Sequence, residues 1–300
     1  MTLPDNQQTT LARAVTCEGI GVHSGALAAM RMLPAPADTG FWFRRTDITD
    51  RPNEIQAHYS HVLDAQLGTT LSNPAGAMVL TVEHVLSACV GMGLDNAMIE
   101  LSGPEAPILD GSALPYARLI AEAGLVAHGV PRRTLRVLKT CEAPDQVPPS
   151  DEQPWVRFAP HLPGEDGLKI SVDISFSHPA IGRQSFDFAL SPEAFLREIA
   201  PARTFGFLKD VTRLHAAGRA LGASLANTIV LSDSGIENPE GLRFPDEFVR
   251  HKVLDAIGDL ALLGARLEGR YQAFKPGHAL TYAQMVRFVA QTENWAQVAD

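Results

Sequence analysis

The sequence predicts an α+β fold whose chain divides near residues 126–132. Both halves contain segments in which apolar and polar residues alternate, as in antiparallel strands with one buried face. Each half also contains a few segments with apolar residues at helical spacing. The 300 residues suffice for two domains of ordinary size, so we expect domains at residues 1–128 and 129–300.

The N-terminal half should begin with strands and continue with two helices. Residues 26–45 alternate loosely and are interrupted by Pro and Gly, which indicates strands and a turn. Residues 81–91 have helical spacing and start at Thr81, a favourable N-cap residue. A strand-like run at residues 95–101 precedes a second helical segment at residues 112–124, which ends at a glycine.

The C-terminal half alternates strands with helices around one irregular segment. Its strands are expected within residues 128–141, 169–178, 184–190, 227–233 and 270–275, and its helices at 192–200, 250–264 and from about 279. Residues 143–155 are rich in Pro and acidic residues and should form an exposed connection between strands. Residues 202–224 are apolar but irregular, because glycines interrupt them.

The composition is that of a globular protein without nucleic-acid-binding or membrane-spanning features. Hydrophobic residues make up 45% and charged residues 20% of the chain. The formal charge of −9, without a dense Lys/Arg run, argues against general nucleic-acid binding. The first ten residues are polar, and no apolar run approaches the roughly 20 residues that span a bilayer. Cys17, Cys89 and Cys141 are odd in number and widely spaced, which fits reduced thiols, so we expect a cytoplasmic protein.

Three polar side chains form one stripe on the apolar helix expected at residues 250–264. His251, Asp255 and Asp259 are four residues apart and therefore share a narrow sector of the helix surface. A solvated face with i,i+4 hydrogen bonds would explain this spacing. However, Asp259 has no charged residue within several positions after it, and a carboxylate in such company usually has a partner. The stripe therefore indicates chemistry without saying which.

Other polar residues are ambiguous when each is taken alone. Glu83 and His84 open the helix expected at residues 81–91, where Glu83 could merely complement the helix dipole. His278 follows a Pro-Gly turn before the last helix, and His23 lies in a Gly-rich turn. Isolated histidines of this kind are more often structural or exposed than catalytic.

Together, these residues match the requirements of a hydrolytic zinc site. Such a site has two His ligands, one carboxylate ligand and an open fourth position. It also needs a base that accepts a proton from water and an acid for the leaving group. The sequence supplies a candidate for each role: His84, His251 and Asp255 as ligands, Glu83 as the base, His278 as the cationic acid, and Asp259 as the carboxylate that holds the His278 ring.

Several long motifs contain these residues and are far more specific than any single spacing. They are TVEHVLSACVGMGLDNAMIELSGPEAPILDGSALPY (81–116), ARTFGF (202–207), GLRFPDEFVRHKVLDAIGDLALLG (241–264) and FKPGHAL (274–280). GIGVHSG and PAPADTGFWFRRTD near the N-terminus extend the match to almost the full length. The chain resembles the UDP-3-O-acyl-N-acetylglucosamine deacetylases, zinc amidases of the lipid A pathway in Gram-negative bacteria.

The resemblance implies a fold and a reaction. The fold would have two similar domains, each with helices packed against a small sheet and each with an insert, and the active site between them. Bound Zn²⁺ would serve hydrolysis of the N-acetyl group of UDP-3-O-acyl-N-acetylglucosamine, giving acetate and the free 2-amine, in the committed step of lipid A biosynthesis. The only partner implied is this nucleotide sugar with its 3-O-acyl chain, without nucleic acid, and we expect a monomer.

The resemblance also implies contacts to the substrate. Thr204 would hydrogen-bond the oxyanion, Phe205 would pack on the sugar, and Lys252 would contact the polar part of the substrate. The second insert would form an apolar passage for the acyl chain, and the residues expected there are Phe207, Val211, Ala223 and Leu225. Ala223 stands where the family commonly has Gly, which bears on acyl-chain length. His23 would lie near the site in an unassigned role.

Two other classes of function stay open at this point. A catalytically silent relative would act as a binding or regulatory protein, and a zinc assay with acetate release separates it from the enzyme. A different amidohydrolase, such as a peptidase, would use the same zinc site on another substrate. Comparing a peptide with the nucleotide sugar discriminates between these.

Overall fold

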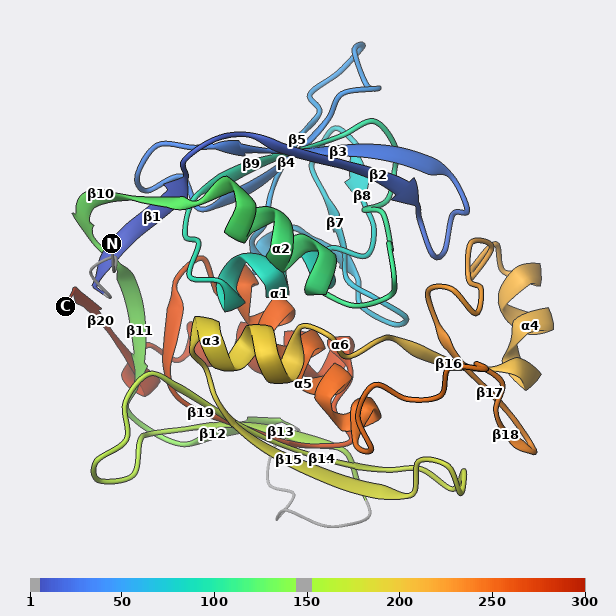
Figure 1. The fold of residues 1–300 in the computed structure, drawn as a ribbon. Coiled ribbons are helices and arrows are strands. Elements are labelled where there is room, and N and C mark those ends of the chain that lie inside the picture. Colours follow the sequence, from blue (N-terminus) through green and yellow to red (C-terminus); the bar gives the residue numbers. More distant parts are fainter. Residues whose placement is uncertain (1–5, 144–152, 300) are drawn as a thin grey trace.

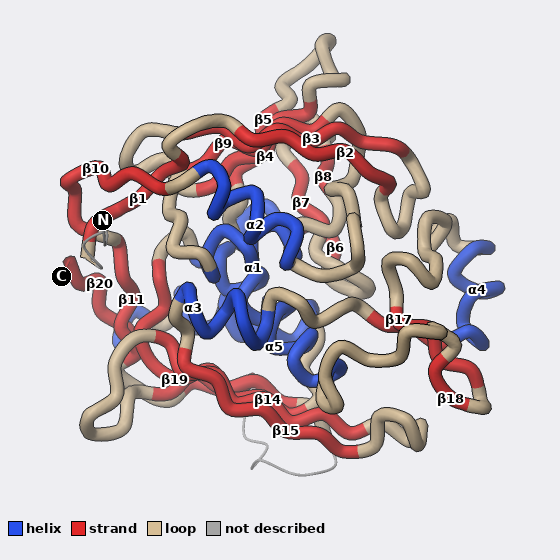
Figure 2. Tube along the Cα trace, in the orientation of Figure 1, coloured by secondary structure: helices blue, strands red, loops and turns tan. Residues whose placement is uncertain are grey.

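Helices lie between two layers of strands in the computed structural model, which describes residues 6–143 and 153–299 (Figure 1). A five-stranded sheet covers α1 and α2, and a seven-stranded sheet lies on the far side of α5 and α6. The tube view shows the helices enclosed by these strands (Figure 2). The main helices are α1 (Glu83–Gly91), α2 (Leu114–Ala123), α5 (Glu247–Leu260) and α6 (His278–Ala290). The shorter ones are α3 (Pro192–Ala194), which continues as a π-helix over Phe195–Ile199, and α4 (Val211–Ala216).

The five-stranded sheet has the order β2-β3-β9-β4-β5. Its strands are β2 (Val15–Ile20), β3 (Leu27–Pro34), β4 (Phe41–Arg45), β5 (Glu54–Gln56) and β9 (Ala97–Leu101). A small three-stranded sheet, with the strands β6 (Val62–Asp64), β7 (Thr70–Ser72) and β8 (Met78–Val79), leads into α1. Strand β1 (Gln7–Leu11) pairs with β10 (Leu125–Pro131) in a separate ribbon.

The seven-stranded sheet contains β11 (Arg133–Val137), β12 (Cys141–Ala143), β13 (Trp155–Ala159), β14 (Leu168–Ser175), β15 (Arg183–Ala189), β19 (Arg266–Phe274) and β20 (Trp295–Ala299). A second three-stranded sheet contains β16 (Phe205–Phe207), β17 (Ile229–Ser232) and β18 (Gly235–Ile236). Together with α4 it lies beside the two main layers (Figure 1). The mixture of several sheets and few helices confirms the expected content of helices and strands.

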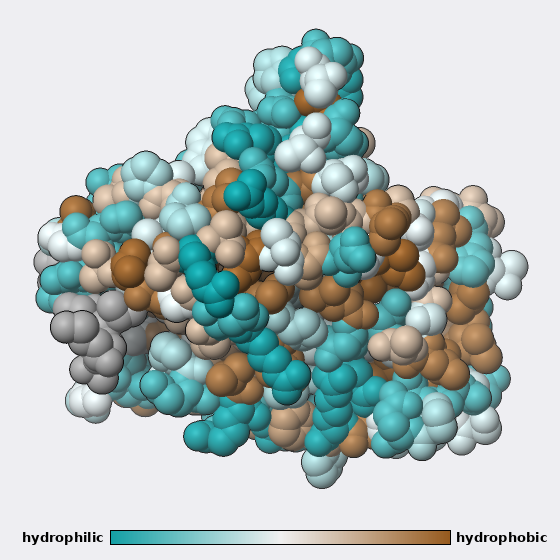
Figure 3. Space-filling model, turned by 45° about the horizontal axis from the view of Figure 1, so that its top comes forward, coloured by the Kyte–Doolittle hydropathy of each residue, from teal (hydrophilic) through white to brown (hydrophobic). Residues whose placement is uncertain are grey.

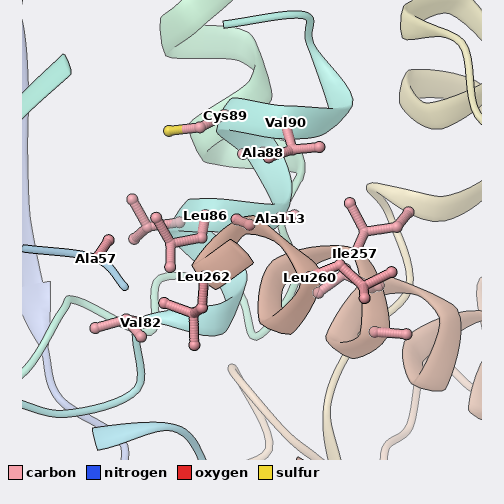
Figure 4. Packing of buried hydrophobic residues seen from close by; sticks show 14 of the residues in the cluster. Ala57, Val82, Leu86, Ala88, Cys89, Val90, Ala113, Ile257, Leu260 and Leu262 are labelled. Atoms are coloured by element: carbon pink, nitrogen blue, oxygen red, sulfur yellow. The ribbon is translucent and has the colours of Figure 1, made fainter. Parts of the chain in front are cut away.

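The two helices that carry the stripe and the Glu-His pair pack directly against each other. Leu86 of α1 lies in one buried cluster with Leu260 at the end of α5 and Leu262 just beyond it (Figure 4). A Cβ atom at Gly258 would lie only 2.0 Å from the carbonyl oxygen of Glu83. Glycine at this position therefore lets the start of α1 lie against α5.

Most predicted elements are found, and three expectations need correction or lie out of reach. Thr81 is not an N-cap: it has φ +56°, and α1 begins two residues later without a side-chain cap. The strands are not all antiparallel, because β4 pairs with β9 in parallel after a crossover through α1. Most of the expected connection at residues 143–155 lies outside the described residues.

Candidate active site

Three potential metal ligands meet where α1 lies against α5. One ligand atom from each of His84, His251 and Asp255 lies within 4.8 Å of the other two, and all three residues are buried. The Nε2 atom of His251 is 3.3 Å from Oδ1 of Asp255, and the Nε2 atom of His84 is 3.9 Å from the same oxygen. Two imidazoles and one carboxylate form a donor set typical of a catalytic zinc site.

The hydrogen bonding around the two imidazole rings is compatible with metal binding. Nδ1 of His251 donates a hydrogen bond of 3.1 Å to the carbonyl of Ala202, which leaves the lone pair on the Nε2 atom that faces Asp255. Nδ1 of His84 is buried and has no hydrogen-bond partner among the described residues. Nε2 of the same ring is the atom that faces Asp255, 3.9 Å from Oδ1. The residues present therefore fit a bound divalent metal ion.

The electrostatics of these three groups also favour metal binding. Burial and, to a smaller extent, the nearby His251 lower the pKa of His84 to about 3. Burial lowers the pKa of His251 too, so both rings are neutral near pH 7. Burial alone would raise the pKa of Asp255, but His251 and Lys252 hold it well below its usual range. Nζ of Lys252 donates to Oδ2 of Asp255 at 2.8 Å.

A second group of polar side chains lies directly beside these ligands. Nδ1 of His278, the first residue of α6, is 2.8 Å from Oδ2 of Asp259. Nε2 of the same ring is 3.8 Å from Oε1 of Glu83 and 3.9 Å from Oδ2 of Asp255. The two carboxylates of the stripe on α5 thus have different partners: Asp255 faces the imidazoles of the ligand group, and Asp259 contacts a histidine from another helix.

Thr69 contacts both Glu83 and Asp259, and no pattern in the sequence predicted it. Its backbone N–H donates to Oε2 of Glu83 at 2.9 Å, and its hydroxyl donates to Oδ1 of Asp259 at 2.7 Å. It precedes β7 on a segment that is distant in sequence from α5, so no local pattern could have placed it there. Ala202, whose carbonyl orients His251, was missed for the same reason.

Glu83 and His278 have displaced pKa values suited to proton transfer. Burial raises the pKa of Glu83 to about 7. Burial alone would lower the pKa of His278, but the carboxylates of Asp259 and Glu83 raise it to about 10. Near neutral pH the first group can accept a proton while the second holds one.

The expected substrate contacts begin at the edge of this group. Phe205 lies edge-on to Phe248, with ring centroids 5.0 Å apart, and its ring is 6.3 Å from that of His251. Nζ of Lys252 is 5.4 Å from the centroid of Phe205. Thr204 is half-buried, and its N–H donates to the carbonyl of Gly111 at 2.8 Å. The structure thus places Lys252 and Phe205 beside the ligands, with Thr204 next in the chain.

The four residues expected along the acyl chain continue outward from this edge. Phe207, in β16, packs against the rings of Phe176 and His178. Val211 begins α4 and is half-buried, whereas Ala223 and Leu225 are exposed in the segment that follows α4. Among the described residues, none of these four makes a ring contact or an ion pair with His84, His251 or Asp255.

His23 lies near Glu83, with Gly68 between the two side chains. A Cβ atom at Gly68 would be 2.9 Å from Oε1 of Glu83 and 3.7 Å from Nε2 of His23, so the glycine separates these two side chains. Nε2 of His23 is 3.3 Å from the carbonyl of Leu67, and its Nδ1 accepts from the N–H of Ala220 at 3.3 Å. Burial lowers the pKa of His23. A neutral ring with one N–H satisfies both hydrogen bonds.

Known proteins resemble the chain over nearly its whole length. The family model LpxC, described as UDP-3-O-acyl N-acetylglycosamine deacetylase, matches residues 8–290. A UDP-3-O-acyl-N-acetylglucosamine deacetylase of Oleidesulfovibrio alaskensis is 47% identical over 279 residues, which cover 91% of this chain and 86% of that protein. Proteins of the same name from an Anaeromyxobacter species and from Neisseria meningitidis are 47% identical over 283 residues (94% and 88% of the two chains) and 41% over 294 residues (97% and 92%). The chain belongs to the UDP-3-O-acyl N-acetylglycosamine deacetylase family.

Proposed function

We propose that the chain hydrolyses the N-acetyl group of UDP-3-O-acyl-N-acetylglucosamine with the help of a bound zinc ion. The observation that carries the proposal is the buried His84–His251–Asp255 group, with Glu83 and the His278–Asp259 pair at its side. Membership of the family supplies the substrate. The products would be acetate and the free 2-amine of the sugar, in the committed step of lipid A biosynthesis.

The metal would be held by His84, His251 and Asp255. Zinc bound there would act as a Lewis acid on the amide carbonyl and on water. His251 is oriented for this by the Ala202 carbonyl, and Asp255 is kept ionised by Lys252. The two neutral rings and the single carboxylate leave the bound ion a net positive charge, which favours developing negative charge on the substrate oxygen.

Glu83 would accept the proton of the attacking water. Its Oε2 is fixed by the Thr69 N–H, and its Oε1 faces the site, 3.8 Å from Nε2 of His278. A pKa near 7 gives it both a sizeable ionised fraction at neutral pH and enough basicity to take the proton.

His278 would carry the positive charge opposite the base. Asp259 fixes its ring through Nδ1, so that the Nε2–H points toward Glu83 and Asp255. From there it can stabilise the tetrahedral oxyanion or protonate the departing amine. Thr204 would add a hydrogen bond to the oxyanion, and Phe205 and Lys252 would contact the sugar and the polar part of the substrate.

A two-domain organisation, residues 1–128 and 129–300, remains part of the proposal. It is supported by the pairing of β10 with β1 and by the entry of the next strand, β11, into the seven-stranded sheet. The small sheets β6–β8 and β16–β18 would be the two inserts. The domains would then meet where α1 packs on α5, which is where the candidate ligands lie.

The second insert would receive the acyl chain along Phe207, Val211, Ala223 and Leu225. Hydrophobic side chains gather at this side of the molecule in the space-filling view (Figure 3). Leu208, Leu221 and Leu225 of this segment are 51%, 52% and 44% exposed, although large apolar residues usually avoid water. An acyl chain laid on them would remove this surface from water.

Mass spectrometry tests the proposed function directly. Purified protein loaded with zinc should convert the acylated nucleotide sugar to a product lighter by one acetyl group and should release acetate. A bound metal without acetate release would favour a silent relative, and turnover of a peptide in place of the sugar would favour a peptidase.

Location and oligomeric state stay predictions. Among the described residues, no helix combines the length and apolar character needed to cross a bilayer. We propose a cytoplasmic monomer, and light scattering on the purified protein would reveal any dimer.

The pH dependence of kcat/KM should be bell-shaped. Glu83 must be ionised, so activity falls as pH drops through its pKa; His278 must be protonated, so activity falls as pH rises through its pKa. These pKa values are about 7 and about 10, and a cation bound nearby would lower both. The acid limb should therefore lie at or below pH 7 and the alkaline limb at or below pH 10. Asp259→Ala should move the alkaline limb to lower pH, because it removes a carboxylate that stabilises the protonated ring. A pH-independent rate between pH 5 and 10 would contradict these roles.

Removing the acyl chain from the substrate should lower kcat/KM by roughly 10²-fold or more, because each buried methylene contributes up to about 0.8 kcal/mol that can orient the distant amide. The measurement compares UDP-N-acetylglucosamine with derivatives of graded chain length. In Ala223→Gly the preferred length should increase, since one methyl group is removed from the passage. Equal rates with and without a chain would show that this segment does not bind the acyl chain. An unchanged length optimum in Ala223→Gly would show only that Ala223 does not determine chain length.

A further inference from the structure

One buried glutamate outside the ligand group, Glu105, binds two segments that border the site. It follows β9, is 1% exposed and pairs with no cation among the described residues. Its Oε1 accepts from the Thr81 hydroxyl at 2.7 Å and from the N–H of His23 at 2.9 Å. Its Oε2 accepts from the N–H of Ser24 at 2.7 Å. A buried carboxylate is costly unless such bonds satisfy it, so these three donors fix its position and it fixes theirs.

Glu105 reaches the site through two chains of hydrogen-bonded residues, which we call arms. The first arm runs through the turn at residues 21–25, which joins β2 to β3. This turn hydrogen-bonds the segment after α4: the N–H of Leu221 donates to the carbonyl of His23 at 3.1 Å, and that of Gly222 donates to the carbonyl of Val22 at 3.0 Å. Figure 1 shows the tip of this hairpin facing the α4 region. By holding the turn, Glu105 also holds the segment proposed to receive the acyl chain.

The contact between the turn and this segment is backbone against backbone. A Cβ atom at Gly222 would be 2.2 Å from the carbonyl oxygen of Gly21. No side chain can be accommodated at Gly222 without separating the two segments. The position can therefore be used to break this arm alone.

The second arm runs through Thr81 to the start of α1. Thr81 has φ +56°, a conformation that β-branched residues rarely adopt. Its hydroxyl bond to Glu105 holds the residue in this conformation, and α1 begins two residues later with Glu83 and His84. Through Thr81, Glu105 thus orients the proposed base and one proposed ligand.

We propose that Glu105 is a positioning residue for both ends of the substrate. Through Thr81 it places Glu83 at the reacting amide, and through the turn at residues 21–25 it places the segment after α4 against the acyl chain. The inference rests on the proposed function, which assigns this segment to the substrate. It predicts that the two arms can be separated by kinetics.

Three variants separate the arms. Thr81→Val keeps the β-branched shape but removes the hydroxyl bond, so kcat should fall about tenfold with KM nearly unchanged. Gly222→Ala separates the turn from the segment, so KM for the acylated substrate should rise about tenfold with kcat nearly unchanged. Glu105→Gln lacks one acceptor for the three donors and should show both effects. Thr81→Ser, which keeps the hydroxyl, should restore kcat.

A readout without turnover tests the turn arm independently. Limited digestion with trypsin can cut after Lys209, Arg213 and Arg219, which flank or belong to α4. Glu105→Gln and Gly222→Ala should be cut there about tenfold faster than wild type, because local opening becomes easier, and Thr81→Val should not. Asp95→Asn is the control: Asp95 is a half-buried carboxylate that also joins distant segments, but it pairs with Arg132 and Arg266.

The outcomes decide the proposal in either direction. It is overturned if Glu105→Gln changes kcat, KM and cleavage no more than Asp95→Asn does, or if Thr81→Val and Gly222→Ala show the same kinetic change. If Glu105→Gln does not fold, the other two variants carry the same test. If wild type does not turn over the nucleotide sugar, the proposed function fails, whereas the cleavage rates still decide whether Glu105 and the turn hold the segment after α4.

Discussion

Glu83→Gln should lower kcat by about 10²–10⁴-fold, the usual contribution of a general base, while the metal stays bound. Glutamine fits the same space and can still accept from the Thr69 N–H at its oxygen, but it cannot take a proton from water. Because Glu83 is not one of the three proposed ligands, the metal content should remain that of wild type. Steady-state kinetics and elemental analysis of the same preparation measure both quantities.

Two comparisons make this prediction sharp. Glu122→Gln changes an exposed glutamate that pairs with Arg13 on the surface, and it should leave kcat unchanged. The pH profile of Glu83→Gln should lose its acid limb, because the group that titrates there is gone. Near-normal kcat in Glu83→Gln would remove Glu83 from the mechanism, and the base would have to be sought elsewhere.

Local patterns in the sequence predict much of the fold. The helices α1 and α2 follow from apolar spacing and glycine stops, and the strands β14 and β15 follow from alternation of apolar and polar residues. Parallel pairing of β4 with β9 does not follow, because it depends on the crossover through α1. The segment after α4 could not be predicted either, since its hydrogen bonds go to a turn about 200 residues away in sequence, as in the bond from Ala220 to His23.

Thr81 shows why a locally sensible prediction can be wrong. Threonine before a helical segment usually caps the helix with its hydroxyl. Here the hydroxyl donates to Glu105 instead, and the backbone takes a left-handed conformation. The preference for a cap is worth only about 1 kcal/mol, so one hydrogen bond to a buried carboxylate can override it.

The candidate site was predicted as a set of residues but not as a geometry. The i,i+4 stripe on α5 places His251 beside Asp255 without any tertiary information, and the structure has them 3.3 Å apart. The approach of His84 depends on Gly258, and the setting of Asp259 depends on Thr69. Both are contacts between segments far apart in the chain, which periodicity cannot report. The catalytic roles of these residues remain predictions.

Asp255→Ala should abolish stoichiometric metal binding and, with it, activity. One of three proposed ligands is lost, and the two neutral imidazoles that remain carry no charge to offset that of the cation. Wild-type protein should hold about one tightly bound zinc per chain, whereas the variant should lose it on desalting, with kcat/KM lower by about 10³-fold or more. Chelation should inactivate wild type in the same way, and added zinc should restore only wild type.

One carboxylate just before α5 and one on α5 provide matched controls. Asp246→Asn alters a residue that pairs with Arg250 at the start of the helix, and it should keep both metal and activity. Asp259→Ala changes the other carboxylate of the stripe; it should keep the metal but lose part of kcat, because Asp259 holds His278 and is not a proposed ligand. Normal zinc content in Asp255→Ala, or loss of zinc in Asp259→Ala alone, would contradict the assignment of Asp255 as the metal ligand and Asp259 as the partner of His278. Two carboxylates one helical turn apart would then have exchanged roles, and the ligand group would have to be redrawn around His278.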